Sequence, residues 1–231
     1  MVKSINSNVA LIIPVYNEGK VIGDVVKGVL KHYKYVVCVD DGSSDDSKEK
    51  IEKTGAYLVN HPINMGQGAA LQTGIEFAKL LPVDYFVTFD ADGQHRLEDV
   101  SKMVEIIEKE KVDFVLGSRF LDEKAIGMPK SKEKILKLAI AFSNSTSGVK
   151  LTDTHNGLRV FNRKVAENIQ ITMPDMAHAS EILEIISKNK YSYKEIPVVI
   201  EYTDYSKAKG QSMLNAINIA FDTLLRKVSN K

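Results

Sequence analysis

Two acidic turns contain the residues best suited to chemistry in this sequence. Asp90 and Asp92 follow an apolar run that ends at Phe89, and only Ala91 separates them. Two carboxylates at this spacing, next to the turn-forming Gly93, suit a hard divalent cation that keeps open positions for a phosphorylated ligand. Taken alone, such a pair is also typical of an ordinary surface turn, because Asp and Gly are common turn residues.

A second acidic turn favours the functional interpretation. The sequence Asp40-Asp41-Gly42-Ser43 also closes an apolar run, the one at residues 35–39. In parallel sheets the carboxyl ends of the strands meet at one edge, and ligands bind beyond that edge. The two acidic turns therefore predict one site.

The elements that must position these turns alternate along the first half of the chain. Apolar runs predict strands at 8–13, 35–39, 57–60, 84–89 and 113–117, and helical periodicity predicts helices at 21–30, 44–51, 66–81 and 97–109. Pro14 is expected to stop the first strand, and Ser44, Asp45 and Asp46 are candidate N-caps. The second half predicts helices at 130–142, 180–188 and 212–228 and strands at 158–161 and 194–202. This alternation predicts an α/β protein with a mainly parallel sheet and helices on both faces.

Composition limits the class of protein. With 231 residues, of which 44% are hydrophobic, the chain is expected to form a single domain around one sizeable core. The net charge of +1 gives no overall attraction for nucleic acid. A lone cysteine, Cys38, excludes a disulfide framework and fits a reducing cytoplasm. We expect no signal peptide and no transmembrane span, because no apolar stretch approaches the roughly 20 residues that a span needs.

The segment after the first strand excludes the usual dinucleotide fingerprint. Residues 14–19 are Pro-Val-Tyr-Asn-Glu-Gly instead of a glycine-rich turn, and a Walker-type Gly-Lys-Ser/Thr loop is also absent. Proline and tyrosine at this place prevent the close backbone approach that three glycines allow to a pyrophosphate. A metal on Asp90 and Asp92 is the available alternative for holding a diphosphate.

Five motifs in order carry a resemblance to a known family. They are residues 12–18 (Ile-Ile-Pro-Val-Tyr-Asn-Glu), 40–43 (Asp-Asp-Gly-Ser), 64–68 (Asn-Met-Gly-Gln-Gly), 90–95 (Asp-Ala-Asp-Gly-Gln-His) and 117–120 (Gly-Ser-Arg-Phe). Together the chain resembles family 2 glycosyltransferases of the GT-A fold, a Rossmann-like architecture, over roughly residues 8–215. Within that family it is most similar to the polyprenyl-phosphate sugar transferases, such as dolichol-phosphate mannose synthases and undecaprenyl-phosphate glucosyltransferases. The resemblance implies one GT-A domain over 1–231, with a nucleotide-sugar half (8–120), an acceptor-side half (121–212) and a C-terminal amphipathic helix (212–231).

The resemblance implies a donor site at the first four motifs. The residues expected to bind the nucleotide sugar are Pro14, Tyr16, Glu18, Asp40, Asp41, Asn64, Gly66, Gln67, Asp90 and Ala91. Tyrosine offers a stacking face, and carboxylates accept hydrogen bonds from base and ribose. Asp90, Asp92 and Gln94 are expected to hold Mg²⁺ or Mn²⁺. Small residues at 64–68 are expected to place a helix start against the phosphates, although a simple helix cap would explain them too.

The resemblance also implies a catalytic and acceptor side. Asp92, Arg119 and Asp153 are the expected catalytic residues, and the expected acceptor-phosphate residues are Arg159, Lys207, Lys209 and Ser212. In the segment 153–159, Leu158 replaces the usual aromatic residue. In the segment that begins at Tyr205, a Lys stands for the usual Arg and Met213 stands where Lys is usual, and these two departures weaken the match to the polyprenyl-phosphate branch. Glu181 and His178 are interpreted first as polar residues beside the core and second as acceptor contacts.

Three functions remain open at this stage. The leading hypothesis is inverting, metal-dependent transfer of one sugar, with UDP-glucose or a UDP-N-acetylhexosamine favoured, to polyprenyl phosphate. A saccharide acceptor in cell-wall, capsule or lipopolysaccharide synthesis is the second, and it would need a carboxylate base such as Asp153. A non-catalytic nucleotide-sugar-binding subunit is the third. The absence of Trp excludes the Gln-x-x-Arg-Trp segment of processive synthases, so a single sugar is expected.

Membrane contact is expected to come from surface elements. Lysines at 130, 132, 134 and 137 surround apolar residues in the 130–142 stretch, which is typical of a helix lying in an anionic lipid interface, although a core-facing helix has the same pattern. A second apolar stripe lies in 212–228. We therefore expect a cytoplasmic protein at the inner face of the cell membrane, recruited with the help of a homo-oligomer or a small membrane partner.

Overall fold

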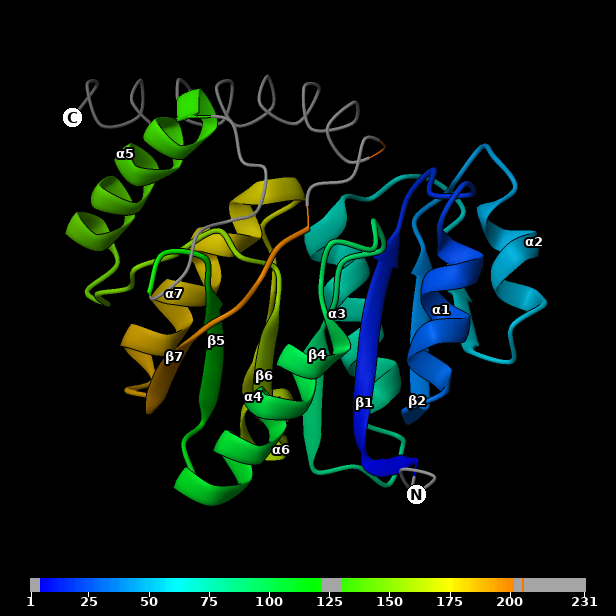
Figure 1. The fold of residues 1–231 in the computed structure, drawn as a ribbon, viewed down its shortest axis with the longest axis horizontal. Helices are drawn as coiled ribbons and strands as arrows, with labels where there is room; N and C mark the ends of the chain where they lie inside the picture. Colours follow the sequence, from blue (N-terminus) through cyan, green and yellow to red (C-terminus); the bar gives the residue numbers. More distant parts are fainter. Residues whose placement is uncertain (1–4, 122–129, 202–204, 206–231) are drawn as a thin grey trace.

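A seven-stranded mixed sheet forms the centre of the molecule. The computed structural model describes residues 5–121, 130–201 and 205. The strands are β1 (Asn6–Val15), β2 (Tyr33–Asp40), β3 (Tyr57–Asn60), β4 (Tyr85–Thr88), β5 (Phe114–Ser118), β6 (Arg159–Asn162) and β7 (Tyr193–Pro197). They are ordered β3-β2-β1-β4-β6-β5-β7, and β6 alone runs antiparallel to its neighbours (Figure 1). The prediction of an α/β fold with a mainly parallel sheet is confirmed.

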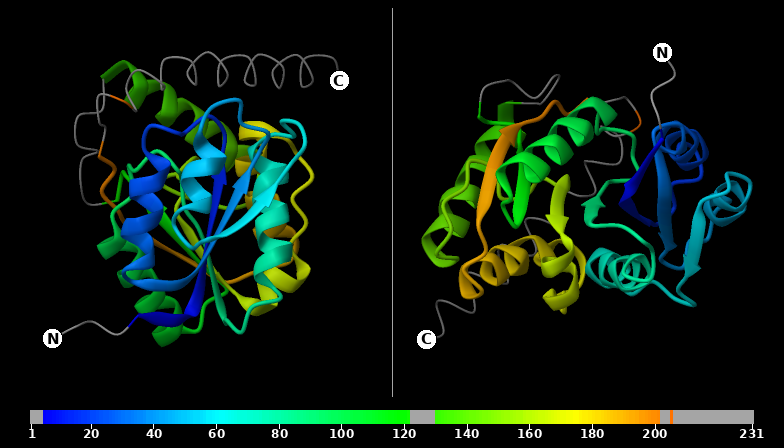
Figure 2. Two further views of the ribbon diagram at one scale, coloured as in Figure 1. Left: turned by 90° about the vertical axis from the view of Figure 1, so that its right-hand side faces the viewer. Right: turned by 90° about the horizontal axis from the view of Figure 1, so that it is seen from below.

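Helices cover both faces of this sheet. They are α1 (Ile22–Leu30), α2 (Ser47–Glu52), α3 (Gln67–Ala78), α4 (Leu97–Glu110), α5 (Lys130–Thr146), α6 (Arg163–Asn168) and α7 (His178–Lys188), with a short 3₁₀ turn at Asp175–Ala177. One buried cluster joins α3, α6 and α7 to one face, and a second joins α1, α2 and α4 to the other. The two layers are visible on either side of the strands in Figure 2.

Each core follows from the alternation of side chains along the strands. In β1, Ala10 and Ile12 belong to the first cluster, whereas Leu11 and Ile13 belong to the second. Successive side chains of a strand point to opposite faces, so a strand buried on both sides is a continuous apolar run. This is why the apolar runs of the sequence located β1, β2 and β4 correctly.

Pro14 does not stop the first strand, so that prediction was wrong. It pairs with Val39 of β2, and β1 continues to Val15. On its other side β1 pairs with β4 only as far as Ile12, opposite Thr88. Proline is tolerated here because it lies beyond the part of β1 that has neighbours on both sides.

Several other boundaries differ from the sequence prediction. Asp46 is the N-cap of α2 but its side chain makes no capping bond, and Asp45 accepts from the Ser47 amide instead, at 3.0 Å. The strand expected at 194–202 ends at Pro197, and α6 was not predicted. In α6 the Asn162 side chain caps the Val165 amide at 3.0 Å, a signal that the sequence contained.

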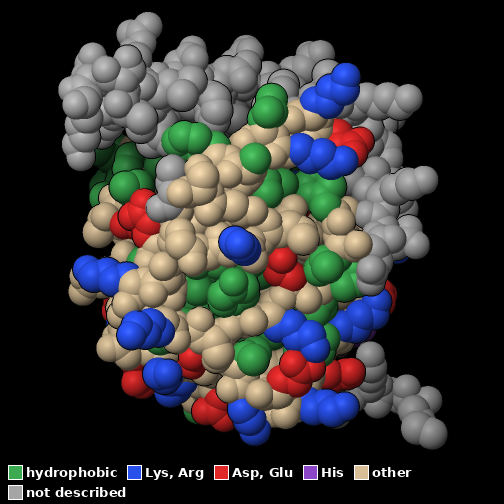
Figure 3. Space-filling model, turned by 90° about the vertical axis from the view of Figure 1, so that its left-hand side faces the viewer, with side chains coloured by type: hydrophobic (Ala, Val, Ile, Leu, Met, Phe, Trp, Pro, Cys, Tyr) green, Lys and Arg blue, Asp and Glu red, His purple; other side chains and the backbone are tan. Residues whose placement is uncertain are grey.

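The amphipathic stretch at 130–142 forms α5, which extends to Thr146. Its apolar side is mostly buried at Leu136, Ala139 and Ile140, while Leu138 is 67% exposed. Lysine and arginine side chains are interspersed with acidic ones on the side of the molecule shown in Figure 3. Among the described residues, no helix combines the length and apolar character needed to cross a bilayer. The helix expected at 212–228 lies outside the described residues.

Candidate active site

The site lies at the edge of the sheet where β1, β2 and β4 end. Because β6 runs antiparallel, its first residue, Arg159, pairs with Thr88 at the end of β4 and lies at the same edge. Asp40 is the last residue of β2, and Asp90 follows β4 after one further residue. The fold thus brings together both acidic turns, as the sequence predicted, and adds the buried Arg159 at the same edge.

Asp41 holds the loop that precedes α3. Its carboxylate accepts hydrogen bonds from the amides of Met65 and Gly66, at 2.9 and 2.8 Å, and contacts the His61 Nδ1 atom at 2.7 Å. The residue is only 3% exposed. Asp41 therefore shapes the wall of the candidate donor pocket, and its carboxylate is occupied by protein donors.

Asp40 differs from Asp41 in having an unused oxygen. Its Oδ1 atom is buried and has no hydrogen-bond partner among the described residues. Burying an unsatisfied polar atom is costly, so such an atom points to a missing donor. Of the two residues, Asp40 is the one whose carboxylate keeps an acceptor that the described protein groups leave unused.

The loop after β1 is fixed by side chains of the segment that follows the second acidic turn. The Glu18 amide donates to Ser47 Oγ at 2.8 Å, and the Gly19 amide donates to the Asp45 carboxylate at 2.9 Å. The buried Glu18 carboxylate accepts from the Tyr205 hydroxyl at 2.7 Å. Burial and the neighbouring Glu18 charge raise the pKa of Tyr205, so this hydroxyl remains a donor.

Glycines at the start of α3 are required by packing. A Cβ atom on Gly68 would overlap the Met173 carbonyl, and one on Gly66 would crowd the Asp175 amide. Gly66 also has a φ of 92°, a region that disfavours L side chains. Contacts with the segment 173–175 thus give these glycines a packing reason, and the role at the phosphates or as a helix cap that the sequence analysis assigned to residues 64–68 stays a prediction.

Asp90 is surrounded by groups that favour its charged form. Its carboxylate accepts from His95 Nε2 at 2.8 Å and from Gln67 Nε2 at 3.4 Å. Burial alone would raise the pKa of Asp90, but the His95 hydrogen bond and the charges of His95 and Arg159 lower it overall. A Cβ on Gly157 would overlap this carboxylate, so glycine is needed there. Asp90 is thus a preformed anionic ligand.

Asp92 lacks an equivalent set of partners. Among the described residues, its side chain accepts one hydrogen bond, from the Gln94 amide to Oδ1 at 3.0 Å. Burial, followed by repulsion from Asp90, raises the pKa of Asp92 to about 6. The His95 charge opposes this rise but does not cancel it, so positive charge compensates Asp92 less fully than Asp90.

A divalent cation fits this deficit. Two carboxylates and the Gln94 amide oxygen are hard oxygen ligands of the type that Mg²⁺ and Mn²⁺ accept. Within the described part of the chain, no group of three or more His, Cys, Asp or Glu side chains is arranged to hold a metal. A cation here would complete its coordination with substrate oxygens or water, as Mg²⁺ commonly does.

Asp153 and Arg119 form a buried ion pair. Arg119 donates from Nε to Asp153 Oδ2 at 2.6 Å and from Nη2 to Oδ1 at 2.8 Å, and its amide donates to Oδ2 at 3.1 Å. Burial would raise the pKa of Asp153, but the Arg119 charge and these hydrogen bonds lower it below its usual value. Such a carboxylate is a weak base, because its proton affinity is reduced.

Arg159 is a buried cation with unused hydrogen-bonding capacity. It is 4% exposed, and its Nη1 atom has no partner among the described residues. Asp90 and Asp153 lie close enough to offset part of the effect of burial, which lowers the pKa of Arg159. A buried guanidinium without a full set of acceptors suits a phosphate ligand.

Glu195 is a positioning residue that sequence reasoning missed. Its carboxylate accepts from the Thr152 amide at 2.9 Å, the Asp153 amide at 3.1 Å and the Thr152 hydroxyl at 3.0 Å. Glu195 lies on β7, beside β5, and so fixes the loop that carries Asp153. No local pattern in the sequence could have found it, because the contact spans more than forty residues.

A segment after β7 closes over the acidic loop. His95 forms an antiparallel bridge with Ile200, the Glu201 amide donates to the Gln94 carbonyl at 3.1 Å, and the Val199 amide donates to Asp99 at 2.9 Å. In the sequence analysis, His95 belongs to the motif at residues 90–95 but has no role of its own. Its contact with Asp90 makes it a positioning residue.

The remaining predicted residues lie around these groups. Tyr16 is 45% exposed, which suits a stacking face, and Pro14 is half-buried. Ala91 is buried, and the Asn64 side chain accepts from the Gly66 amide at 3.1 Å. Lys207, Lys209 and Ser212 lie outside the described residues.

The chain thus has an α/β fold in which two acidic turns and the buried arginines Arg119 and Arg159 lie at one edge of a mainly parallel sheet. The sequence profile of glycosyl transferase family 2 matches residues 10–170. The chain therefore belongs to glycosyltransferase family 2 and is a glycosyltransferase.

Relatives and solved structures agree with this assignment. The chain is 34% identical over 240 residues to the UDP-N-acetylglucosamine–dolichyl-phosphate N-acetylglucosaminyltransferase of Methanococcus voltae, covering 94% of this chain and 95% of that protein. It is 29% identical over 232 residues to a dolichyl-phosphate beta-glucosyltransferase of Trichomonas vaginalis, covering 89% and 69%. A crystal structure of glucosyl-3-phosphoglycerate synthase from Mycobacterium tuberculosis with Mg²⁺ and UDP superposes with a TM-score of 0.67 at 16% identity, covering 86% of this chain and 72% of that one. This last likeness confirms the GT-A-like fold.

Proposed function

We propose that this glycosyltransferase moves one sugar from a nucleotide sugar to the phosphate of a polyprenyl phosphate. The observation that carries the proposal is that the buried Asp153 carboxylate is paired with Arg119. Its ion pair with Arg119 lowers its pKa, so it is poorly suited to remove a proton from a sugar hydroxyl. An acceptor phosphate is already anionic and needs no base.

The names of two relatives support the same acceptor class. The proteins of Methanococcus voltae and Trichomonas vaginalis are both named as dolichyl-phosphate sugar transferases. The first also names UDP-N-acetylglucosamine as donor, and the M. tuberculosis structure contains UDP. For this chain we therefore favour UDP-glucose or a UDP-N-acetylhexosamine.

Donor binding is assigned to the β1, β2 and β4 ends. Asp40 accepts from the base with its unused buried oxygen, Tyr16 stacks on the base, and Glu18 accepts from the ribose. Asp90, Asp92 and Gln94 would hold Mg²⁺ or Mn²⁺. When bound, this ion supplies charge neutralisation for the leaving nucleoside diphosphate.

Transfer proceeds by a single inverting displacement. An oxygen of the acceptor phosphate forms a bond to the anomeric carbon while the bond from that carbon to the diphosphate oxygen breaks. The buried charge of Arg159 stabilises phosphate oxygens near Asp90. Lys207, Lys209 and Ser212 are proposed to position the acceptor phosphate together with it.

The acceptor places the enzyme at a membrane surface. We propose attachment at the cytoplasmic face through the exposed side of α5, where Lys134, Lys137 and Leu138 are exposed, and through 212–228. One amphipathic element usually gives only reversible attachment. A homo-oligomer or a small membrane partner is therefore part of the proposal.

An assay of nucleoside diphosphate release tests the acceptor. The protein is mixed with UDP-, GDP- and dTDP-sugars, with and without undecaprenyl phosphate, and free saccharides form the comparison arm. We expect release that depends on the lipid phosphate. Efficient release with free saccharides and none with lipid phosphate would contradict the proposal.

The same assay tests the metal. Asp92→Ala or excess EDTA should reduce turnover by about 10² to 10³, because the diphosphate would lose one electrostatic contact in the transition state. Full turnover of Asp92→Ala in EDTA would contradict the metal assignment. Lys102→Gln is a matched control, since Lys102 lies on the exposed side of α4 and pairs with Asp99.

A further inference from the structure

His178 is a buried histidine that the mechanism derived above does not use. It is the first residue of α7 and is 3% exposed. Its Cβ atom lies 3.2 Å from the position that a Cβ on Gly68 would take, so it packs beside the start of α3. Asp90 and Arg159 lie close enough for their charges to act on its ring. The beginning of α7 therefore lies at the same edge of the sheet as the acidic loop.

A backbone contact fixes the hydrogen positions of the His178 ring. The Nδ1 atom contacts the Asp175 carbonyl oxygen. A carbonyl oxygen can only accept a hydrogen bond, so Nδ1 carries a hydrogen. Burial, followed by the Arg159 charge, lowers the pKa of His178 to about 4, so the ring is neutral at neutral pH. A neutral imidazole has one N–H group, and Nε2 is therefore a hydrogen-bond acceptor.

This acceptor is unused by the protein. Within residues 5–121, 130–201 and 205, the contact of Nδ1 with Asp175 is the single hydrogen bond of the His178 side chain. His61 shows the contrast, because both of its ring nitrogens are occupied, by Asp41 at 2.7 Å and by Thr73 at 2.9 Å. An unused acceptor in a residue as buried as His178 points to a donor that comes from a ligand.

The chemistry of the available ligand groups selects a hydroxyl for this acceptor. An ionised phosphate oxygen carries no hydrogen, so it can accept from Arg159 but cannot donate to His178 Nε2. A metal-ligand role does not fit, because in the part of the chain that the structure describes no three His, Cys, Asp or Glu side chains are arranged around a common ion position. A sugar hydroxyl can donate to Nε2 while its oxygen accepts from a neighbouring cation, and Arg159 Nη1 is such an unused donor among the described residues.

We propose that His178 determines donor specificity by accepting a hydrogen bond from a hydroxyl of the sugar that is transferred. In the proposed displacement this sugar lies between the leaving diphosphate, assigned to the metal at Asp90, and the attacking phosphate, assigned to Arg159. A side chain that lies near both Asp90 and Arg159 is therefore near the sugar. The inference rests on the donor site of the proposed function, but it is independent of the acceptor.

Calorimetric titration with donor analogues tests the contact without any acceptor. UDP, UDP-glucose, UDP-N-acetylglucosamine and analogues of each sugar that lack one hydroxyl are titrated in the presence of Mg²⁺. For the wild type we expect one missing hydroxyl to weaken binding roughly three- to tenfold, the effect of one lost hydrogen bond. His178→Asn can place its amide nitrogen where Nδ1 lies and keep the Asp175 contact, but it lacks the acceptor at Nε2. In this variant the same missing hydroxyl should cause no further loss.

His178→Gln is the complementary variant. Its longer side chain can place an amide oxygen where Nε2 lies, so it should keep part of the discrimination between the complete sugar and the analogue. UDP alone should bind equally well to the wild type and to both variants, because UDP carries no sugar hydroxyl to donate to His178. A residue with a purely structural role would not separate UDP from UDP-sugars in this way.

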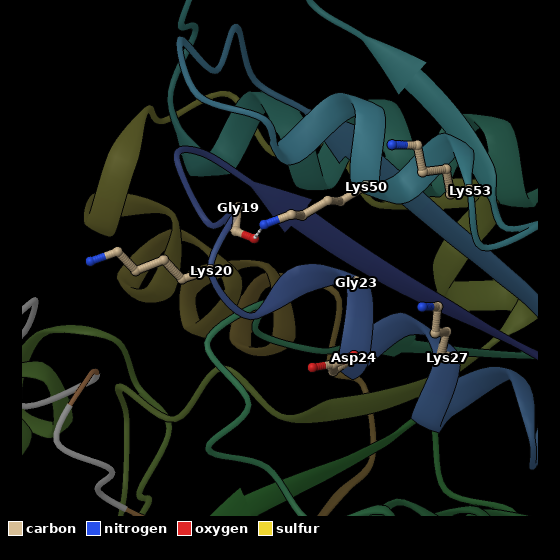
Figure 4. Close-up of a pocket in the computed structure, with 7 residues that line it drawn as sticks. All are labelled: Gly19, Lys20, Gly23, Asp24, Lys27, Lys50 and Lys53. Carbon is tan, nitrogen blue, oxygen red and sulfur yellow. Dashed lines mark hydrogen bonds between the residues drawn. The ribbon is translucent and has the colours of Figure 1, made fainter.

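Two control variants should leave the discrimination unchanged. His32→Asn removes an exposed histidine that precedes β2, at the opposite edge of the sheet. Lys27→Gln changes a side chain at the hollow between α1 and α2, where Lys50 donates to the Gly19 carbonyl (Figure 4). The inference is overturned if every missing hydroxyl weakens binding equally in the wild type and in His178→Asn, or if His178→Asn weakens UDP as much as UDP-sugars. Failure of the wild type to bind any nucleotide sugar would overturn the proposed function together with it.

Discussion

Asp41 on the donor side and Asp153 on the acceptor side are buried to the same extent, each 3% exposed, but they are neutralised differently. Asp41 accepts from two backbone amides and contacts His61, so it organises a loop with dipoles. Asp153 accepts from a guanidinium, so it balances a full charge. The difference teaches that equal burial of two carboxylates can serve different ends: Asp41 fixes a backbone loop, whereas Asp153 balances the charge of a buried guanidinium.

Removal of Arg119 should have the largest effect. Arg119→Leu leaves the buried Asp153 carboxylate without its cation, and breaking a buried pair in this way costs about 3–5 kcal/mol of unfolding free energy. The double variant Arg119→Leu/Asp153→Leu should recover most of this loss. Urea unfolding of the two single variants and the double variant measures the coupling. Strictly additive losses would show that the pair is not the source of the effect.

Asp41→Asn should have the next largest effect. The amide keeps the shape of the side chain but replaces one acceptor with a donor, so the amides of Met65 and Gly66 cannot both be satisfied. We expect a loss of about 1–3 kcal/mol, the cost of leaving a buried donor unpaired. Hydrogen exchange at these two amides should accelerate more than exchange in β5. Unchanged protection would contradict the role given to Asp41.

His178 should make the free energy of unfolding depend on pH. Burial, followed by the Arg159 charge, lowers the pKa of His178 from 6.5 to about 4, and its Nδ1 hydrogen donates to the Asp175 carbonyl. Because the folded-state pKa is lowered, the unfolded chain takes up the proton first. The contribution to stability is therefore complete above about pH 6.5 and is lost as the pH falls toward 4.

The test is the change in unfolding free energy between pH 7 and pH 5. The wild type should lose about 1–2 kcal/mol more than His178→Gln over this interval, since a shift of one pKa unit corresponds to 1.36 kcal/mol. His32→Gln is a suitable control, because His32 is exposed. Equal losses in the wild type and His178→Gln would contradict a neutral buried histidine.

Glu195→Gln should have the smallest effect on stability and a more informative effect on catalysis. The half-buried side chain accepts from the Thr152 and Asp153 amides, and the variant should lose about 0.5–1.5 kcal/mol. Since the loop carries Asp153, kcat should fall while the donor KM stays nearly constant. Glu195→Asp, which retains the charge, should restore part of kcat. Equal changes in both parameters, without rescue, would indicate a purely structural role.

The donor side was predicted better than the acceptor side for a physical reason. Donor-side strands alternate with helices and are buried on both faces, so local apolar runs located them and the acidic turns beyond them. The antiparallel β6 and the contact of Glu195 with the Asp153 loop depend on pairing between distant segments. No local periodicity encodes such pairing.

The predicted residues themselves show the same limit. The sequence identified Asp41, Arg119 and Asp153 from motifs, but it could not show that Arg119 and Asp153 bind each other or that Asp41 is occupied by backbone amides. Conversely, the unused oxygen of Asp40 became visible only when its surroundings were known. Motifs select residue types, whereas the partners come from the fold.

The bridge between His95 and Ile200 has a consequence for the order in which the chain matures during synthesis. Val199 contacts Asp99 across 100 residues of sequence. At a translation rate of about 5–20 residues per second, the acidic loop waits roughly 5–20 s for the segment that closes over it. The nascent chain would therefore present the Asp90 loop to solvent well after β4 has been made, and competence to bind a donor would arise late in translation.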